Sequence, residues 1–187
     1  MNQYYILEET FKKEKAYLLL PNFKKDLLNK ISAGKPLSEI QQKDIELFIK
    51  GKDLKDFMGS AKIIVVSNKF LNVLNSLSVS NYHAYPIKLS NTSKTRNYND
   101  YFLFIPEVVS FFDYKNSDYE GMEKERYIGQ INKMVVDSSK LEGRRICRFY
   151  ELITDILIDE TLKSAFEKEN VKGLNYIPAS EFKFPYF

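Results

Sequence analysis

The clearest signal in the pattern of apolar and polar positions is a strand-like run followed directly by a helical one, and it occurs twice. Residues 63–66 are four consecutive β-branched residues, and Ser67 then precedes apolar side chains at helical spacing. Residues 156–158 are again apolar, and Asp159 precedes a second helical stripe. A continuous apolar run is typical of a buried strand, and Ser and Asp are favoured helix N-caps. The pattern therefore predicts two units in which a strand leads into a capped helix.

The first third of the chain predicts a hairpin and a short helix. Residues 4–7 and 17–20 have β-type composition and are separated by a charged linker, so we expect them to pair with each other. Residues 22–31 place apolar side chains at helical spacing before a glycine and a proline interrupt the pattern. This segment predicts a helix.

A second N-terminal helix is indicated by a capping box. Ser38 and Gln41 have the spacing at which each side chain can bond to the backbone amide of the other. Apolar side chains follow within residues 45–49, and Gly51 is a common helix stop. We therefore expect a helix that runs from the capping box to Gly51.

Strand signals dominate the region between the two strand-to-helix units. The candidate strands are residues 85–89, 101–105, 108–112, 134–136 and 146–149, with a polar loop at 90–99 and a turn at Gly143 before the last strand. No linker rich in Pro, Gly or Ser separates two folding units. The chain therefore predicts one α/β (α+β) domain over residues 1–187, with a mixed, mainly antiparallel sheet and helices packed on it.

Composition narrows the class of protein. The chain has 187 residues, of which 44% are hydrophobic and 28% charged, as expected for a folded domain. The 28 basic and 25 acidic residues leave a net charge of +3, and the scattered lysines do not predict a nucleic-acid groove. The single cysteine, an N-terminus unlike a signal peptide and the lack of any stretch of about 20 apolar residues predict a cytoplasmic protein without a membrane partner.

Residues that carry nucleophilic or metal chemistry are few. His83 is the only histidine, and Cys147 lies in an apolar run, a position typical of a buried and inert thiol. One His and one Cys cannot complete a zinc site, and the glycines are too far apart for a phosphate-binding loop. The sequence therefore predicts no catalytic residues, no metal and no cofactor.

Carboxylates keep an enzymatic alternative open. Asp155, Asp159 and Glu160 form one acidic group, and Glu123 and Glu125 form another. Two carboxylates are sufficient for some hydrolases, although helix capping and surface charge explain both groups equally well. A small hydrolase that uses carboxylates or the Cys147 thiol is therefore the alternative function.

A group of arginines is the one feature that suggests nucleic-acid binding. Arg144, Arg145 and Arg148 stand close together in the sequence, beside Phe149 and Tyr150. A strand pair with an exposed arginine edge explains the same group. We expect no nucleic-acid partner, and the opposite hypothesis predicts binding that weakens with salt.

A series of segments within residues 60–178 carries a family resemblance. The segments are residues 64–70 (IVVSNKF), 85–87 (YPI), 101–104 (YFLF), 108–113 leading to Ser117, 135–137 (VVD) with the turn at Gly143, 146–148 (ICR), 156–166 and the closing 171–178 (VKGLNYIP). In this order they resemble the eleventh numbered immunity family of bacterial polymorphic toxin systems, whereas residues 1–58 carry no such resemblance. The resemblance implies a protein that binds a cognate toxin and blocks it, with no catalysis of its own.

The segment most suited to binding a partner spans residues 113–127. It carries Tyr114, Tyr119, Arg126 and Tyr127 among charged residues and has no apolar periodicity that would bury it. Tyr and Arg are frequent anchors at protein interfaces. We therefore expect these four residues to contact the toxin, and the alternative is that the tyrosines cover the sheet edge of their own domain.

Two further observations bear on the partner. The C-terminal residues Phe182, Phe184, Tyr186 and Phe187 form a rival aromatic patch, which is also compatible with a terminal strand that packs on the domain. The net charge of +3 argues against general mimicry of a nucleic acid. A local acidic patch is still compatible with this charge.

Overall fold

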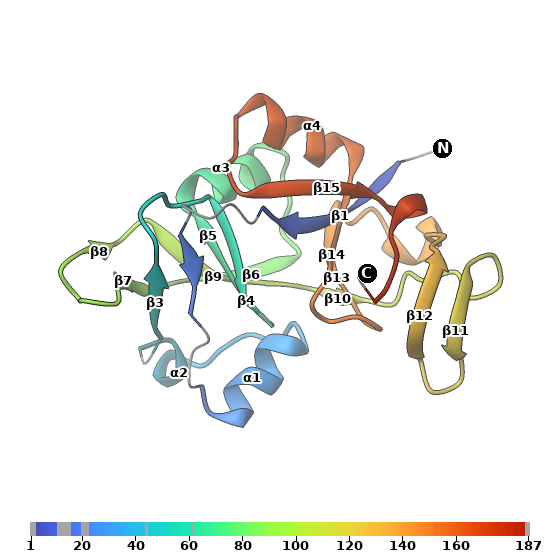
Figure 1. The fold of residues 1–187 in the computed structure, drawn as a ribbon, viewed down its shortest axis with the longest axis horizontal. Helices are drawn as coiled ribbons and strands as arrows, with labels where there is room; N and C mark the ends of the chain where they lie inside the picture. The colour runs from blue at the N-terminus through green and yellow to red at the C-terminus, as the bar shows by residue number, and fades with distance from the viewer. Residues whose placement is uncertain (1–2, 11–15, 20–22, 44, 61, 186–187) are drawn as a thin grey trace.

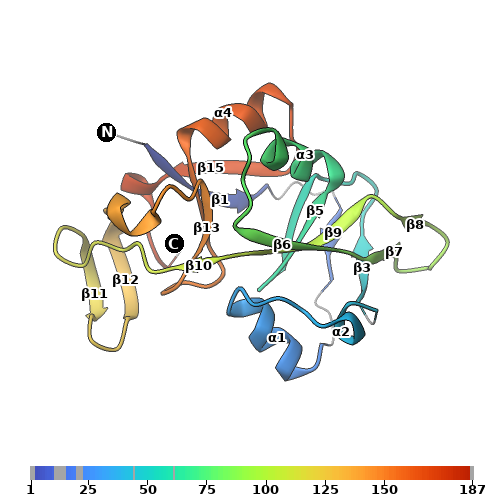
Figure 2. The same ribbon diagram turned by 180° about the vertical axis from the view of Figure 1, so that it is seen from behind.

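The computed structural model describes residues 3–10, 16–19, 23–43, 45–60 and 62–185, and it has an α+β architecture of four mostly antiparallel sheets with helices packed on them (Figure 1; Figure 2 shows the reverse side). The strands are β1 (Tyr4–Glu9), β2 (Tyr17–Leu18), β3 (Glu46–Lys50), β4 (Phe57–Ser60), β5 (Ile63–Ser67), β6 (Tyr82–Pro86), β7 (Lys88–Asn91), β8 (Asn97–Tyr98), β9 (Tyr101–Pro106), β10 (Val108–Val109), β11 (Asp118–Met122), β12 (Tyr127–Lys133), β13 (Ile146–Phe149), β14 (Ile156–Asp159) and β15 (Leu174–Pro178). The helices are α1 (Lys25–Ser32), α2 (Glu39–Lys43), α3 (Asn68–Ser76) and α4 (Glu160–Lys168), with short 3₁₀ turns η1 (Ser138–Leu141) and η2 (Ala179–Glu181).

A five-stranded sheet in the order β10-β13-β14-β1-β15 joins the two ends of the chain. Strand β1 lies between β14 and β15 and pairs antiparallel with both, so that Ile6 is opposite Leu157 on one side and Ile177 on the other. Three consecutive residues of β1 are buried, as expected for a strand covered on both faces. The N-terminal strand is therefore held by segments from the last third of the sequence.

Two four-stranded sheets form the other part of the molecule, in the orders β4-β5-β9-β6 and β2-β3-β7-β8. Strand β5 is buried along its whole length and pairs antiparallel with β4 and β9. The predicted strands at 101–105 and 63–66 are confirmed by β9 and β5. Their continuous apolar sequence matches their burial on both faces.

Helices α3 and α4 lie side by side along one face of the sheets (Figure 1). The rings of Phe70 in α3 and Phe166 in α4 stack with centroids 4.5 Å apart, at the centre of a buried apolar cluster. The side chain of Ser67 accepts a hydrogen bond from the backbone N–H of Phe70 at 3.3 Å, and Asp159 accepts one from Leu162 at 2.8 Å. Both strand-to-helix units and both caps predicted from the sequence are therefore confirmed.

Helices α1 and α2 lie on the opposite side of the molecule from α3 and α4 (Figure 1). Helix α1 confirms the helix expected within residues 22–31 from Lys25 onward, and it buries Ile31 in a second apolar cluster. The capping box is also confirmed. The backbone N–H of Ser38 donates to Gln41 Oε1 at 3.0 Å, and the N–H of Gln41 donates to Ser38 Oγ at 3.4 Å.

The hairpin expected between residues 4–7 and 17–20 is wrong. Strand β1 pairs with β14 and β15, whereas β2 pairs with β3. Residue 20 lies outside the described part of the chain. A run with three buried residues needs partners on both edges and cover on both faces, which a short isolated hairpin does not provide.

The helix expected from the capping box to Gly51 is also wrong beyond Lys43. Residues 46–50 form β3, in which Leu47 and Ile49 are fully buried while Glu46 and Lys50 are exposed. This alternation has the period of a strand, and β3 pairs in parallel with β7. The same apolar residues also fit helical spacing, and it is the pairing with β7 that makes this segment a strand and not a helix.

Several strand boundaries differ from the sequence expectation. Residues 85–89 are split at Ile87 between β6 and β7, which belong to different sheets. The loop expected at 90–99 contains the end of β7 and all of β8, which pair as a short hairpin. Of residues 108–112, only the first two are in a strand.

The C-terminal half holds one further correction. Residues 134–136 are not a strand, although Val136 forms an isolated bridge with Phe112. The strand here is β12, which ends at Lys133 and pairs with β11, a strand that lies within residues 113–127. The predicted strand at 146–149 is confirmed by β13, and the turn at Gly143 is confirmed by its φ of 81° after Glu142 at 49°.

A buried ion pair ties the five-stranded sheet to the sheet that contains β4. Lys55 and Glu9 form a salt bridge in which their side chains are only 1% and 4% exposed. Glu9 also accepts a hydrogen bond from the N–H of Gly59 at 2.7 Å, and Lys55 donates to the carbonyl of Thr10 at 3.1 Å. The charges are therefore satisfied by each other and by the backbone.

We predict that Lys55→Ala destabilises the fold strongly, because it leaves the Glu9 carboxylate buried without its cation. The expected loss in the free energy of unfolding is roughly 3–5 kcal/mol, measured by urea denaturation. Lys52→Ala is the control, since Lys52 is exposed three residues earlier. A loss below about 1 kcal/mol for Lys55→Ala would contradict the importance of this pair.

Candidate functional site

Strands β11 and β12 form a two-stranded hairpin that extends away from the rest of the molecule (Figure 1). They pair antiparallel from Asp118 opposite Lys133 to Met122 opposite Tyr127, with two register shifts along β11. Four residues connect the two strands. The hairpin overlaps the segment 113–127, from which the sequence analysis expected partner binding, over residues 118–127.

Glycine is required where the hairpin closes. A β-carbon on Gly121 would lie 2.2 Å from the carbonyl oxygen of Tyr127 on the paired strand, which is far inside a normal contact. Arg126, the last residue of the connection, has a φ of 50° in the left-handed region. The local sequence therefore allows the two strands to approach closely and reverse direction.

Aromatic packing holds the base of the hairpin. The ring of Phe112, which is fully buried, makes edge-to-face contacts with Tyr114 at 5.0 Å and with Tyr119 at 5.3 Å between centroids. Ile128 and Ile131 of β12 are buried in the same apolar cluster. A two-stranded hairpin is marginal by itself, so this packing supplies much of what keeps it in place.

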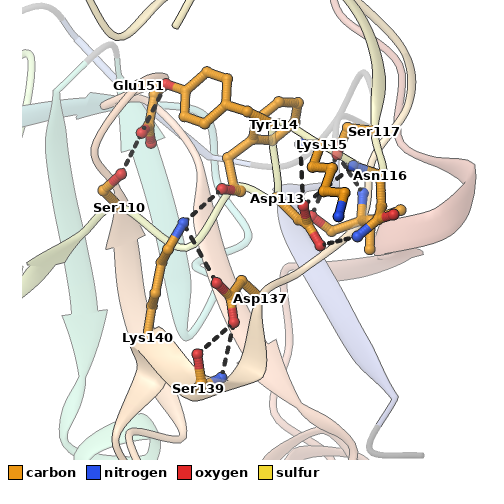
Figure 3. Close-up of polar contacts among 12 residues, drawn as sticks. Ser110, Asp113, Tyr114, Lys115, Asn116, Ser117, Asp137, Ser139, Lys140 and Glu151 are labelled. Atoms are coloured by element: carbon orange, nitrogen blue, oxygen red, sulfur yellow. Dashed lines mark hydrogen bonds and ion pairs between the residues drawn. The ribbon is translucent and has the colours of Figure 1, made fainter. Parts of the chain in front are cut away.

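A polar network also reinforces the base of the hairpin (Figure 3). Asp113 accepts hydrogen bonds from the backbone N–H groups of Lys115 and Asn116, both at 3.1 Å, and from the Asn116 side chain at 2.7 Å. Ser117 Oγ accepts a hydrogen bond from the N–H of Val135 at 2.9 Å. These contacts fix the turn that leads into β11.

Lysine and glutamate side chains complete the network (Figure 3). Lys140 donates to the carbonyl of Phe112 at 3.1 Å and pairs with Asp137 at 3.4 Å. Tyr114 donates from its hydroxyl to Glu151 at 3.1 Å. Burial and the adjacent Glu151 raise the pKa of Tyr114 above its usual range. Tyr114 therefore remains a neutral hydrogen-bond donor at physiological pH.

The far end of the hairpin differs from its base because all six residues from 122 to 127, here called the hairpin tip, are exposed. Met122 and Tyr127 are cross-strand partners and are 54% and 56% exposed. The guanidinium of Arg126 lies 5.0 Å from the centre of the Tyr150 ring, which is itself 45% exposed. The tip therefore presents apolar and aromatic surface to solvent.

The four residues expected to bind the partner fall into two groups. Tyr114 and Tyr119 are half-buried and touch each other at 5.4 Å as part of the hairpin base. Arg126 and Tyr127 are exposed at the tip. The sequence analysis did not single out Met122, although an exposed methionine beside a tyrosine in a polar segment is the signal by which it could have been found.

The rival C-terminal patch is only partly available. Phe182 is fully buried, and Phe184 forms an isolated bridge with Ile131 of β12. These contacts agree with the expectation of a terminal segment that packs on the domain. Tyr186 and Phe187 lie outside the described residues.

The remaining nucleophile candidates lie apart from the hairpin tip. Cys147 is 1% exposed inside β13, and burial raises the pKa of its thiol well above the usual range. Such a thiol is a poor nucleophile at neutral pH. His83 lies on β6, half-buried, with its ring 6.3 Å from that of Tyr85.

The three arginines expected as a possible phosphate-binding group do not share one surface. Arg148 is fully buried and donates to the carbonyls of Ile153 and Lys62 at 2.5 and 3.2 Å. Burial lowers the pKa of Arg148 to about 10, which still leaves it charged. Arg144 pairs with Glu107 and Glu142, and Arg145 pairs with Asp159.

The acidic residues considered for hydrolysis have structural roles or lie at the tip. Asp159 caps α4 and pairs with Arg145 at 2.7 Å. Glu160 accepts a hydrogen bond from the hydroxyl of Tyr5, which lowers the pKa of the carboxyl. Asp155 is buried beside Thr154. Glu123 and Glu125 are exposed in the hairpin tip.

A surface hollow of about 740 Å³ lies near the start of β1, between residues 133–136 and η2. Lys133 is the one charged residue among the described residues that line it. None of the carboxylates considered for hydrolysis, nor Cys147, lines this hollow.

Within the described residues, no group of three or more His, Cys, Asp or Glu side chains could hold a metal ion. None of the helices that the structure describes has the length and apolar character of a membrane span.

Comparison with known protein families identifies the chain. A family model described as the immunity protein family Imm11 matches residues 24–181 of the 187 residues. The protein therefore belongs to the Imm11 immunity protein family, as the segment order predicted. The match begins at residue 24, so it includes α1, α2 and β3, which the resemblance over residues 60–178 had left out. A search of curated proteins found no match.

The Asp113 network predicts a pH-dependent contribution to stability. Hydrogen bonds from Asn116 hold the pKa of Asp113 below its ordinary value of 3.8. The carboxylate therefore stabilises the fold fully above that value, and this stabilisation is lost as the pH falls through the lower folded-state pKa. We expect Asp113→Ala to be less stable than wild type at neutral pH, with a difference that shrinks below pH 3.8.

Urea denaturation at a series of pH values measures this difference. Asp118→Ala is the control, because it removes an exposed carboxylate whose one described hydrogen bond is a long contact of 3.4 Å from Asn132. A difference between wild type and Asp113→Ala that stays constant down to about pH 3 would contradict the prediction.

Proposed function

We propose that this protein binds a cognate toxin in the bacterial cytoplasm and neutralises it through protein–protein contact, without catalysis of its own. Membership of the Imm11 immunity family supports a role in toxin immunity and suggests a non-catalytic one. The toxin belongs, in this proposal, to a polymorphic toxin system. Neither a nucleic acid nor a membrane takes part.

The single observation that carries the binding proposal is the contrast between the two ends of the hairpin. Its base is fixed by Phe112, Tyr114 and Tyr119 and by the Asp113 network, while residues 122–127 are all exposed. A contact surface that is already ordered before binding loses little conformational entropy when the partner arrives. The hairpin tip therefore has the properties of a preorganised contact surface.

Within this surface, Arg126 and Tyr127 make the direct contacts with the toxin. Their side chains combine a large apolar area with a polar end, which is typical of binding hot spots. Tyr114 and Tyr119, the other two expected contact residues, act as positioning residues because they hold the hairpin against Phe112.

The burial of the other candidates supports binding over hydrolysis. The Cys147 thiol is buried and its pKa is raised, and Asp159 caps α4 and pairs with Arg145. A hydrolase that uses Cys147 or Asp159 would have to act from these buried or paired positions, whereas Glu123 and Glu125 are exposed on the hairpin tip. The binding proposal requires no such rearrangement.

Co-expression tests the proposed function directly. Cells that express the toxin encoded beside the gene for this protein should grow when the protein is also present, and an unmatched toxin is the control. Failure to restore growth, together with failure of the two purified proteins to bind, would refute the proposal.

Affinity measurements test the contact residues. We expect Tyr127→Ala and Arg126→Ala each to weaken toxin binding by more than about 1 kcal/mol, measured by calorimetry on variants that keep the wild-type melting temperature. Tyr17→Ala and Arg96→Ala are matched controls, because they remove an exposed tyrosine and an exposed arginine in β2 and next to β8. Equal effects at the tip and at the control positions would exclude the tip as the contact surface.

A further inference from the structure

We infer that Tyr150 is a positioning residue for recognition of the toxin, because its ring holds the Arg126 side chain and thereby fixes the direction of the hairpin tip. The inference rests on the proposed function and adds to it a residue that lies outside the hairpin. Tyr150 follows β13 directly, in the connection between β13 and β14. Three sets of contacts support this role.

The first concerns Arg126, which the turn alone does not hold. Its backbone N–H donates to the carbonyl of Glu123 at 3.0 Å, but its side chain is exposed. No carboxylate of the described chain forms an ion pair with its guanidinium. The guanidinium instead lies 5.0 Å from the centre of the Tyr150 ring, a distance at which a cation is attracted to an aromatic face. This contact therefore favours one conformation of a long side chain.

The second concerns the backbone of Tyr150, which is fixed to the body of the protein. Its N–H donates to the carbonyl of Val109 in β10 at 3.0 Å, and the preceding Phe149 is fully buried in β13. The ring is 45% exposed but extends from this fixed backbone. An arginine ordered by such a ring before binding loses less conformational entropy when a partner arrives.

The third concerns the next residue, which contacts the other end of the hairpin. Glu151 accepts hydrogen bonds from the hydroxyl of Tyr114, at 3.1 Å, and from that of Ser110 (Figure 3). Tyr114 belongs to the hairpin base, whereas Arg126 belongs to the tip. Two consecutive residues of one connection thus contact both ends of the hairpin. Contacts at two separate points restrict the rotation of the hairpin, which contact at the base alone would allow.

Exposed apolar side chains gather at the same place. In the part of the chain that the structure describes, the exposed large hydrophobic side chains are those of Tyr17, Met122, Tyr127 and Tyr150. Met122 and Tyr127 are cross-strand partners at the tip, and Tyr150 contacts Arg126. Tyr150 therefore joins the body of the protein to the surface that the proposed function assigns to toxin contact.

Calorimetry with a catalytically inactive form of the toxin encoded beside the gene measures the effect of the ring. Tyr150→Ala should weaken binding by roughly three- to fivefold, as expected for the loss of one exposed cation–π contact. Tyr150→Phe keeps the ring and should change the affinity by less than about 1.5-fold. Tyr17→Ala is the matched control, because it removes a tyrosine that is 41% exposed in β2, and it should bind like the wild type.

A double-mutant cycle distinguishes positioning from direct contact with the toxin. If Tyr150 acts through Arg126, Tyr150→Ala should have almost no further effect in a protein that already carries Arg126→Ala. Additive effects would refute the positioning role. The control cycle combines Tyr150→Ala with Lys94→Ala, since Lys94 lies 5.1 Å from the centre of the Phe48 ring, outside the hairpin. The effects of these two substitutions should be additive.

A measurement without the toxin tests the contact itself. In NMR spectra of the free protein, the ring current of Tyr150 should shift the side-chain protons of Arg126 upfield, because the guanidinium lies over the ring. Tyr150→Ala should abolish this shift, and Tyr150→Phe should preserve it. Unchanged amide signals from β5 in both variants show that the fold is intact.

The outcomes separate this inference from the proposed function. If the wild-type protein does not bind the toxin, the proposed function fails, and recognition through Tyr150 fails with it. If the wild type binds and Tyr150→Ala binds equally well, the function stands and the positioning role is refuted. Arg126 proton shifts that are the same with and without the ring also refute it.

Discussion

The fold depends on the insertion of the N-terminal strand between two strands from the end of the chain. Strand β1 pairs on one edge with β14 and on the other with β15, which gives the five-stranded sheet its continuity. The carboxylate of Glu9, at the end of this strand, is then buried against Lys55 and accepts a hydrogen bond from the N–H of Gly59 in β4. Burial of a charge in this position is tolerated only because its partners are already in place. Contacts of such large separation in sequence make this arrangement cooperative, since the strand has no stable position until its distant neighbours form.

The five-stranded sheet supports the hairpin that carries the candidate site. Strand β13 carries the buried Phe149, and its ring stacks on that of Phe111 with centroids 4.6 Å apart. The residue after Phe111 is Phe112, which lies at the base of the hairpin. The rings of Phe149, Phe111 and Phe112 therefore connect the five-stranded sheet to the base of the hairpin. Tyr114 and Tyr119 complete this aromatic group and leave the tip beyond it exposed. The base is ordered because its residues belong to the buried apolar cluster, and the tip is exposed because the cluster does not extend to it.

Local signals in the sequence were sufficient for the strand-to-helix units, because Ser67 and Asp159 act on the backbone within three residues. They were insufficient where two periods fit the same residues, as in β3, whose pairing with β7 decides for a strand. The partners of β1 could not be predicted, since they lie more than 140 residues away. The hairpin was missed as a structure because β11 is polar and mostly exposed, and because β12 has an extra residue at each of the two register shifts, so neither strand alternates regularly. For the same reason the four candidate contact residues appeared equivalent in the sequence, although contact with Phe112 divides them into two groups.

The exposed tip has a consequence for how such a protein changes over time. Its six side chains belong to none of the three buried clusters, and with the exception of Gly121 at its border the tip imposes few steric demands on the fold. Substitutions there alter the surface that another molecule meets while the sheets and helices keep their packing. In the proposed role of the tip as the contact surface, recognition and folding are encoded by separate sets of residues, and new specificities can arise by substitution at one short turn without a compensating change in the core.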